Sequence, residues 1–193
     1  VDVEMEQLKD AYESCKHTVL IYGIREIIRK ELRDTPKKAK VGETKLRSNI
    51  LSLYDIFAAS HQLSITAEHR QLADKYCNSY RKFGGSKPKD VMFNDFLIVA
   101  CASCKEMDVV VSEDEKTMLT ENALKAYKHI NDANGKRTPR FINYKKFKSE
   151  LRGCLSNKFI GSPNKLRVFL VFLNFLDQIV KISFFPFHIM LKR

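Results

Sequence analysis

Apolar residues recur along the first 155 positions with two different periods, and the two periods alternate. Unbroken apolar runs at Thr18–Tyr22 and Val109–Val111 are typical of short strands that are buried on both faces. Stretches in which apolar residues return every three or four positions predict helices. We expect helices at 3–16, 24–33, 45–59, 66–83, from Asp90 through the segment that carries Asp95, at 120–134 and from Asn143 onward, with a further short strand at 140–142.

This alternation of strands and helices predicts an α/β domain. Strands that are buried on both faces usually belong to a parallel sheet covered by helices. Clear breaks fall at Thr35-Pro36 and at Gly84–Pro88, which contain residues that end helices. A length of 193 residues allows one domain with a real core, with or without an appendage.

The last part of the chain, 156–193, differs in composition from the rest. Residues 156–164 are expected to form a linker, and the Phe-rich stretch that begins at Leu166 places polar residues on one narrow helical face. We therefore predict a C-terminal hydrophobic helical tail outside a domain of residues 1–155. Arg167, Asp177 and Lys181 disfavour a transmembrane span, which leaves an interfacial membrane helix, a partner-binding helix or a cap on the domain.

Charge and cysteine content narrow the functional classes. The chain has 34 Lys and Arg against 23 Asp and Glu, a formal net charge of +11, and this excess favours a polyanion such as nucleic acid as partner. Its five cysteines are odd in number and scattered, which is typical of reduced thiols in the cytoplasm rather than of a disulfide framework.

Three carboxylates stand out because they fall where the pattern calls for apolar residues or a strand end. Glu31 continues the helical stripe of Ile24, Ile27 and Ile28, Asp95 interrupts an apolar helix, and Asp114 follows the second strand. A buried carboxylate costs several kcal/mol unless it is paired or binds a metal. Metal-dependent chemistry on an anion would account for acids buried inside a basic protein. Alternatively, Glu31 reaches solvent, Asp95 is a first-turn acid favoured by the helix dipole, and Asp114 is a cap.

Three segments resemble the motifs of the PIN-domain nucleases, and within them the archaeal VapC-like proteins. Tyr22–Pro36 contains a Glu-Leu pair after a strand, 94–103 contains an Asp followed by an Ile-x-Ala helix, and 109–118 contains a Ser-x-Asp after a hydrophobic strand. The resemblance covers about residues 1–155. It implies a three-layer α/β/α domain with a central parallel sheet.

The resemblance also implies a function. Glu31, Asp95 and Asp114 would be catalytic and metal-binding acids for Mg²⁺ or Mn²⁺, supported by Ser112, Glu113 and Asn94. The activity would be hydrolysis of phosphodiester bonds in single-stranded RNA, as in the toxin of a toxin–antitoxin pair. The implied partners are RNA, an antitoxin protein and a second copy of the chain. Contact between the tail and a membrane surface is a further alternative. Basic residues near Glu31 would hold the RNA backbone or, alternatively, form a solvated helix face: Arg25, Arg29, Lys30, Arg33, Lys37 and Lys38.

The start of the chain departs from the family pattern. PIN domains open with a strand that ends in a metal-binding Asp, whereas this chain starts with Val1-Asp2. Asp2 would be that ligand only if a truncated strand ends there. Otherwise we expect the chain to lack the first, central strand and its acid, so a catalytically impaired module that binds RNA or protein is the alternative to a nuclease.

Overall fold

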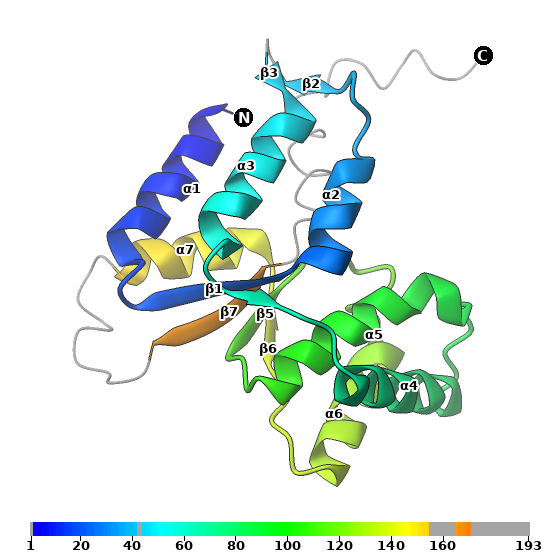
Figure 1. The fold of residues 1–193 in the computed structure, drawn as a ribbon. Coiled ribbons are helices and arrows are strands. Elements are labelled where there is room, and N and C mark those ends of the chain that lie inside the picture. Colours follow the sequence, from blue (N-terminus) through cyan, green and yellow to red (C-terminus); the bar gives the residue numbers. More distant parts are fainter. Residues whose placement is uncertain (1, 42–43, 155–164, 171–193) are drawn as a thin grey trace.

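The computed structural model describes residues 2–41, 44–154 and 165–170 (Figure 1). Helices and strands alternate as the hydrophobic pattern predicts. The elements are α1 (Asp2–Cys15), β1 (Val19–Ile24), the π-helical turn η1 (Arg25–Arg29), α2 (Lys30–Asp34), β2 (Lys40–Val41), β3 (Thr44–Lys45), α3 (Leu46–Ala58), β4 (Gln62–Leu63), α4 (Ala67–Lys82), α5 (Lys89–Cys104), β5 (Val109–Val111), α6 (Glu121–Ala133), β6 (Arg140–Ile142), α7 (Tyr144–Cys154) and β7 (Leu166–Leu170).

Five of the strands form one all-parallel sheet in the order β4-β1-β7-β5-β6. Helices α1, α3 and α7 pack against one another on one side of the sheet, and α4, α5 and α6 lie on the other (Figure 1). The predicted α/β class with a central parallel sheet is therefore confirmed, in three layers. Strands β2 and β3 form a separate antiparallel pair.

Two helices begin at a threonine whose side chain caps the first turn. Thr66 caps α4, since its side chain accepts a hydrogen bond from His69 N while His69 Nδ1 accepts one from Thr66 N. Thr120 caps α6 in a similar way, through the backbone N of Ala123. Helix α5 begins at Lys89 after Pro88, one residue before the expected start at Asp90, which lies in its first turn.

The largest difference from the sequence prediction concerns the C-terminal segment. We expected a helical tail outside a sheet that lacked its central strand. Instead, Leu166–Leu170 forms strand β7, which lies between β1 and β5 at the centre of the sheet. The physical reason is that β1 and β5 each present an edge of unpaired backbone groups, and a short apolar segment satisfies both edges at once.

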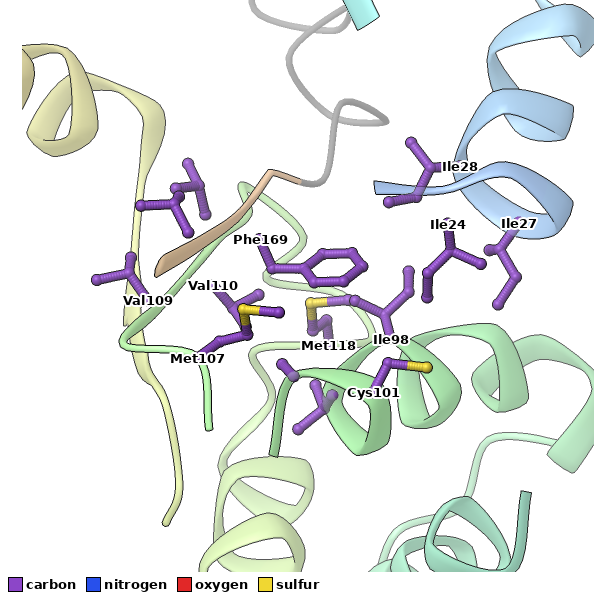
Figure 2. Close-up of a cluster of buried hydrophobic side chains, with 14 of the residues drawn as sticks. Ile24, Ile27, Ile28, Ile98, Cys101, Met107, Val109, Val110, Met118 and Phe169 are labelled. Carbon is purple, nitrogen blue, oxygen red and sulfur yellow. The ribbon is translucent and has the colours of Figure 1, made fainter. Parts of the chain in front are cut away.

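The side chains of β7 also fill the core. Val168 lies opposite Ile21 on one neighbouring strand and Val109 on the other, and Phe169 follows in the same register. Val168 and Phe169 are both fully buried. Figure 2 shows Phe169 in the buried cluster that also contains Ile98 of α5. The strand therefore connects the packing on the two halves of the sheet.

One carboxylate fixes the beginning of β7. Asp108 Oδ2 accepts a hydrogen bond from the backbone N of Arg167 at 2.7 Å, and the backbone N of Asp108 donates to Arg167 O at 2.9 Å. The other oxygen of Asp108 pairs with Arg137 at 2.7 Å. On the opposite side, Leu166 N donates to Thr18 O at 2.8 Å. These bonds hold the entry of the strand from both neighbours.

The remainder of the predicted linker and tail, 156–164 and 171–193, lies outside the described residues, and so do Asp177 and Lys181. Among the residues that the structure describes, no helix is long and apolar enough to cross a membrane.

We predict that Phe169→Ala lowers the free energy of unfolding by about 3–5 kcal/mol, because it opens a cavity at the centre of the sheet. Urea denaturation followed by circular dichroism measures the change. Val91→Ala is the control, since Val91 is 52% exposed on α5 and its truncation should cost less than about 0.5 kcal/mol. A Phe169→Ala variant as stable as the control would show that β7 does not occupy the sheet in solution.

Candidate active site

The parallel sheet brings three acid-bearing segments to its carboxyl edge. Strand β1 leads through η1 into α2, which carries Glu31, and β5 leads into the turn that carries Asp114. Helix α5 contributes Asp95 from its second turn. Residues that follow parallel strands meet at the same edge, which is where α/β proteins place their ligand sites. The arrangement of the sheet therefore brings together acids that are distant in sequence.

Glu31 is only partly accessible to solvent. Asn94 of α5 donates a hydrogen bond from Nδ2 to Glu31 Oε1 at 3.0 Å, which joins α2 to α5. The second oxygen, Oε2, is buried and has no hydrogen-bond partner. Burial raises the pKa of Glu31, and the bond from Asn94 opposes this effect. A buried carboxylate oxygen without a donor is costly, so the site favours a cation or a proton at this atom.

Asp95 is the most perturbed acid of the site. Its side chain is 7% exposed, and burial raises its pKa from 3.8 to about 7. The nearby hydroxyl of Thr117 lowers the pKa, whereas the negative charges of Asp114 and Glu31 raise it further. Asp114 and Glu31 are therefore close enough to Asp95 for their charges to disfavour its ionised form.

Asp114 is held by the turn that follows β5. Its Oδ1 accepts hydrogen bonds from the backbone N of Lys116 at 2.9 Å and of Thr117 at 2.8 Å. Its Oδ2 accepts a hydrogen bond of 2.6 Å from Thr117 Oγ1. The backbone N of Asp114 donates to Ser112 Oγ at 3.1 Å, and Ser112 is itself buried. Asp114 is thus fixed in position, and much of its acceptor capacity is used within the turn.

Two predicted site residues have different roles in the structure. Glu113 does not face the other acids: its Oε1 accepts a 2.7 Å hydrogen bond from the backbone N of Tyr144, at the start of α7. Arg29 is held by Asp55 of α3 through two hydrogen bonds, Nε to Oδ1 at 2.9 Å and Nη2 to Oδ2 at 2.8 Å. Alternation along the strand end sends Glu113 to the neighbouring helix, and the ion pair gives Arg29 a structural role between η1 and α3.

The other basic residues of the predicted RNA surface are exposed on η1, on α2 and in the loop that follows it. They are Arg25, Lys30, Arg33, Lys37 and Lys38.

Three residues of the site were not predicted. Thr117 contacts Asp114 and lowers the pKa of Asp95, as described above. Lys87 donates from Nζ to Lys116 O, and its charge also lowers the pKa of Asp95. The fully buried hydroxyl of Tyr127 has no hydrogen-bond partner, and after burial the charge of Asp95 is the largest cause that raises its pKa. None of these has a distinctive sequence signal, because Thr, Lys and Tyr are common in turns, loops and cores.

Asp2 does not end a strand, contrary to the arrangement that would make it the first acid. It begins α1, a helix that packs on α7 and α3, and its side chain lies outside the described part of the structure. Strand β7, which has the central position, continues in sequence with Val171-Phe172-Leu173. None of those three residues has a carboxylate.

The described acids fit a hard cation in chemistry, although they are not arranged as a complete ligand set. Mg²⁺ and Mn²⁺ prefer carboxylate oxygens, and the unpartnered Oε2 of Glu31 beside the buried Asp95 supplies such donors. Among the described residues, however, no group of three or more His, Cys, Asp or Glu side chains is positioned to hold a metal ion.

Comparisons with protein-family models, with curated proteins and with solved structures find no match for this chain. The functional argument therefore depends on the residues of the site.

We predict that Asp95→Asn stabilises the metal-free protein above neutral pH. A raised folded-state pKa means that the contribution of Asp95 to stability is fully present below about pH 4 and is lost as the pH rises through 7. At pH 8 the variant should exceed the wild type by on the order of 2–4 kcal/mol, and the difference should vanish near pH 4. Urea unfolding in EDTA at pH 4, 6 and 8 measures it.

The control is Asp90→Asn, an exposed acid in the first turn of the same helix, which should follow the wild type at every pH. Equal stabilities of Asp95→Asn and wild type at pH 8 would contradict the burial of an ionisable Asp95.

Proposed function

We propose that this chain is a metal-dependent endoribonuclease of the PIN type, which hydrolyses phosphodiester bonds of single-stranded RNA. The observation that carries the proposal is the buried Asp95, with a pKa raised to about 7, beside Glu31 and Asp114 at the carboxyl edge of a parallel sheet. Buried acids that repel one another are costly to stability and are typical of functional sites. The net charge of +11 favours an anionic substrate.

Each acid has a distinct part in this proposal. Glu31 and Asp95 would bind Mg²⁺ or Mn²⁺ through carboxylate oxygens, and Asp114 would hold Thr117 and bring a further negative charge to the site. When bound, such a cation polarises a phosphoryl oxygen and lowers the pKa of a water molecule that attacks phosphorus. The positive charge would also keep Asp95 ionised at neutral pH.

The surroundings of the acids would serve the same reaction. Asn94 orients the carboxylate of Glu31 through its 3.0 Å hydrogen bond. Lys87 lies near enough to Asp95 to lower its pKa, and it brings a positive charge to the side of the site where a substrate phosphate would approach. Exposed Arg25, Lys30 and Arg33 offer contacts to further phosphates, which would raise affinity without selecting a base sequence.

A second candidate function is an RNA- or protein-binding module with impaired catalysis. It is favoured by Asp2, which begins helix α1 and does not end a strand, as the first acid of the family pattern would. A site with three acids instead of four binds a divalent cation more weakly, since fewer charged ligands compensate for its hydration. This candidate predicts RNA binding without cleavage.

We predict that the purified chain cleaves unstructured RNA in Mn²⁺, and that Asp95→Asn and Asp114→Asn each reduce the rate by about 100-fold or more by removing a charge from the metal site. Asparagine keeps an Oδ1 acceptor for the backbone of the Asp114 turn, but its amide nitrogen cannot accept the hydrogen bond from Thr117 Oγ1, so thermal unfolding must show that Asp114→Asn is folded before its rate is compared. Gel analysis of a labelled RNA of about 20 nucleotides measures the rate, with EDTA as the blank.

Glu26→Gln is the matched control, because Glu26 is an exposed acid of η1 close in sequence to Glu31. It should keep the wild-type rate. RNA binding without cleavage by the wild type, together with no thermal stabilisation by Mn²⁺, would reject the nuclease and leave the binding module.

A further inference from the structure

A second feature of the molecule is an open hollow at the end of α2 that is remote from β1. Figure 1 shows β2, β3 and the start of α3 gathered there. The hollow has a volume of about 270 Å³ and is lined by Lys37, Lys45, Arg47 and Ser48. Lys37 comes from the loop after α2, Lys45 ends β3, and the other two residues lie in the first turn of α3. Only Lys37 was predicted to contact nucleic acid.

The charge of this hollow is uncompensated among the described residues. Among the residues that the structure describes, its lining contains three cations and no carboxylate, and none of the three cations forms an ion pair with an acid. Some basic residues elsewhere do pair with a carboxylate, as Arg29, Lys89 and Lys136 do. Like charges around one hollow repel one another, and a bound anion relieves that repulsion.

The donors suit a tetrahedral anion. An arginine guanidinium offers two parallel N–H groups to a phosphate, and lysine ammonium groups add point charges. Ser48 adds a hydroxyl donor. The first turn of α3 contains no acidic residue, so no carboxylate of that turn competes with a bound anion for these cations.

We propose that this hollow binds a backbone phosphate of single-stranded RNA whose scissile bond lies at the acid site. The identification of the anion as RNA rests on the proposed function. Lys37 is six residues from Glu31, so their Cα atoms are at most about 20 Å apart. A substrate of several nucleotides can span that distance. The hollow would therefore contribute to affinity for longer RNA and would leave the chemistry unchanged.

The test compares the affinities of two double variants for an unstructured RNA of 12 nucleotides, measured by fluorescence anisotropy in EDTA, where no cleavage occurs. Lys45→Gln with Arg47→Gln should weaken binding by about tenfold. The slope of log affinity against log salt should fall in magnitude by about 0.7 for each phosphate that the variant no longer neutralises. The control is Lys125→Gln with Lys128→Gln, which removes the same charge from α6, where each lysine pairs with an acid. It should weaken binding less than twofold.

A variant that keeps both charges, Lys45→Arg with Arg47→Lys, should bind within about threefold of the wild type, and thermal unfolding checks that every variant is folded. Equally weakened binding in the two double variants would overturn the proposal, because it would show a response to net charge alone. Unchanged binding in both, or no RNA binding by the wild type, would also overturn it. Cleavage is assayed separately in Mn²⁺, so a protein that binds RNA through the hollow without cleaving it rejects the proposed function and retains this site.

Discussion

The fold depends on the pairing of β7 with two strands at once. Without it, β1 with β4 and β5 with β6 would be separate strand pairs, because no other strand of the described structure joins them. Each pair would then expose a row of unpaired backbone groups. The hydrogen bonds from Arg167 and Leu166 to Asp108 and Thr18 begin the pairing, and the burial of Val168 and Phe169 supplies its apolar contribution. A single five-residue strand thus unites the core.

The candidate active site is a consequence of the same pairing. Glu31 follows β1 and Asp114 follows β5, and these strands are held one strand apart by β7. Asp95 makes the folded protein less stable when it is ionised, because its burial beside two other acids disfavours its charged form. The free energy gained by apolar burial in the sheet offsets the cost of burying the ionised form of Asp95. This is the usual relation between a rigid scaffold and strained functional groups.

Local sequence patterns predicted most of the helices and strands. The same patterns indicated the candidate acids, because a charge at an apolar position interrupts the pattern. Val109–Val111 is recognisable as a buried strand from its composition, and Thr66 and Thr120 mark helix starts by their own side chains. Glu31 and Asp95 were visible as charges at apolar positions. Thr117 and Tyr127 were not, because their roles come from contacts that only the tertiary structure creates. Glu113 was misassigned because its neighbour in space, the start of α7, is 31 residues away in sequence.

Strand β7 escaped prediction for a different physical reason. A five-residue apolar segment has no period long enough to distinguish a strand from a helix, and the longer tail around it suggested a helical stripe. What decides its conformation is the gap between β1 and β5, and a gap in a sheet is not a property of any local segment. The order of strands in space is set by which edges remain unpaired, whereas the order along the chain is constrained only by connections that can span the distance. The central strand of this sheet can therefore be the last one along the described part of the chain, while β1 and β5 on either side of it still lead to Glu31 and Asp114.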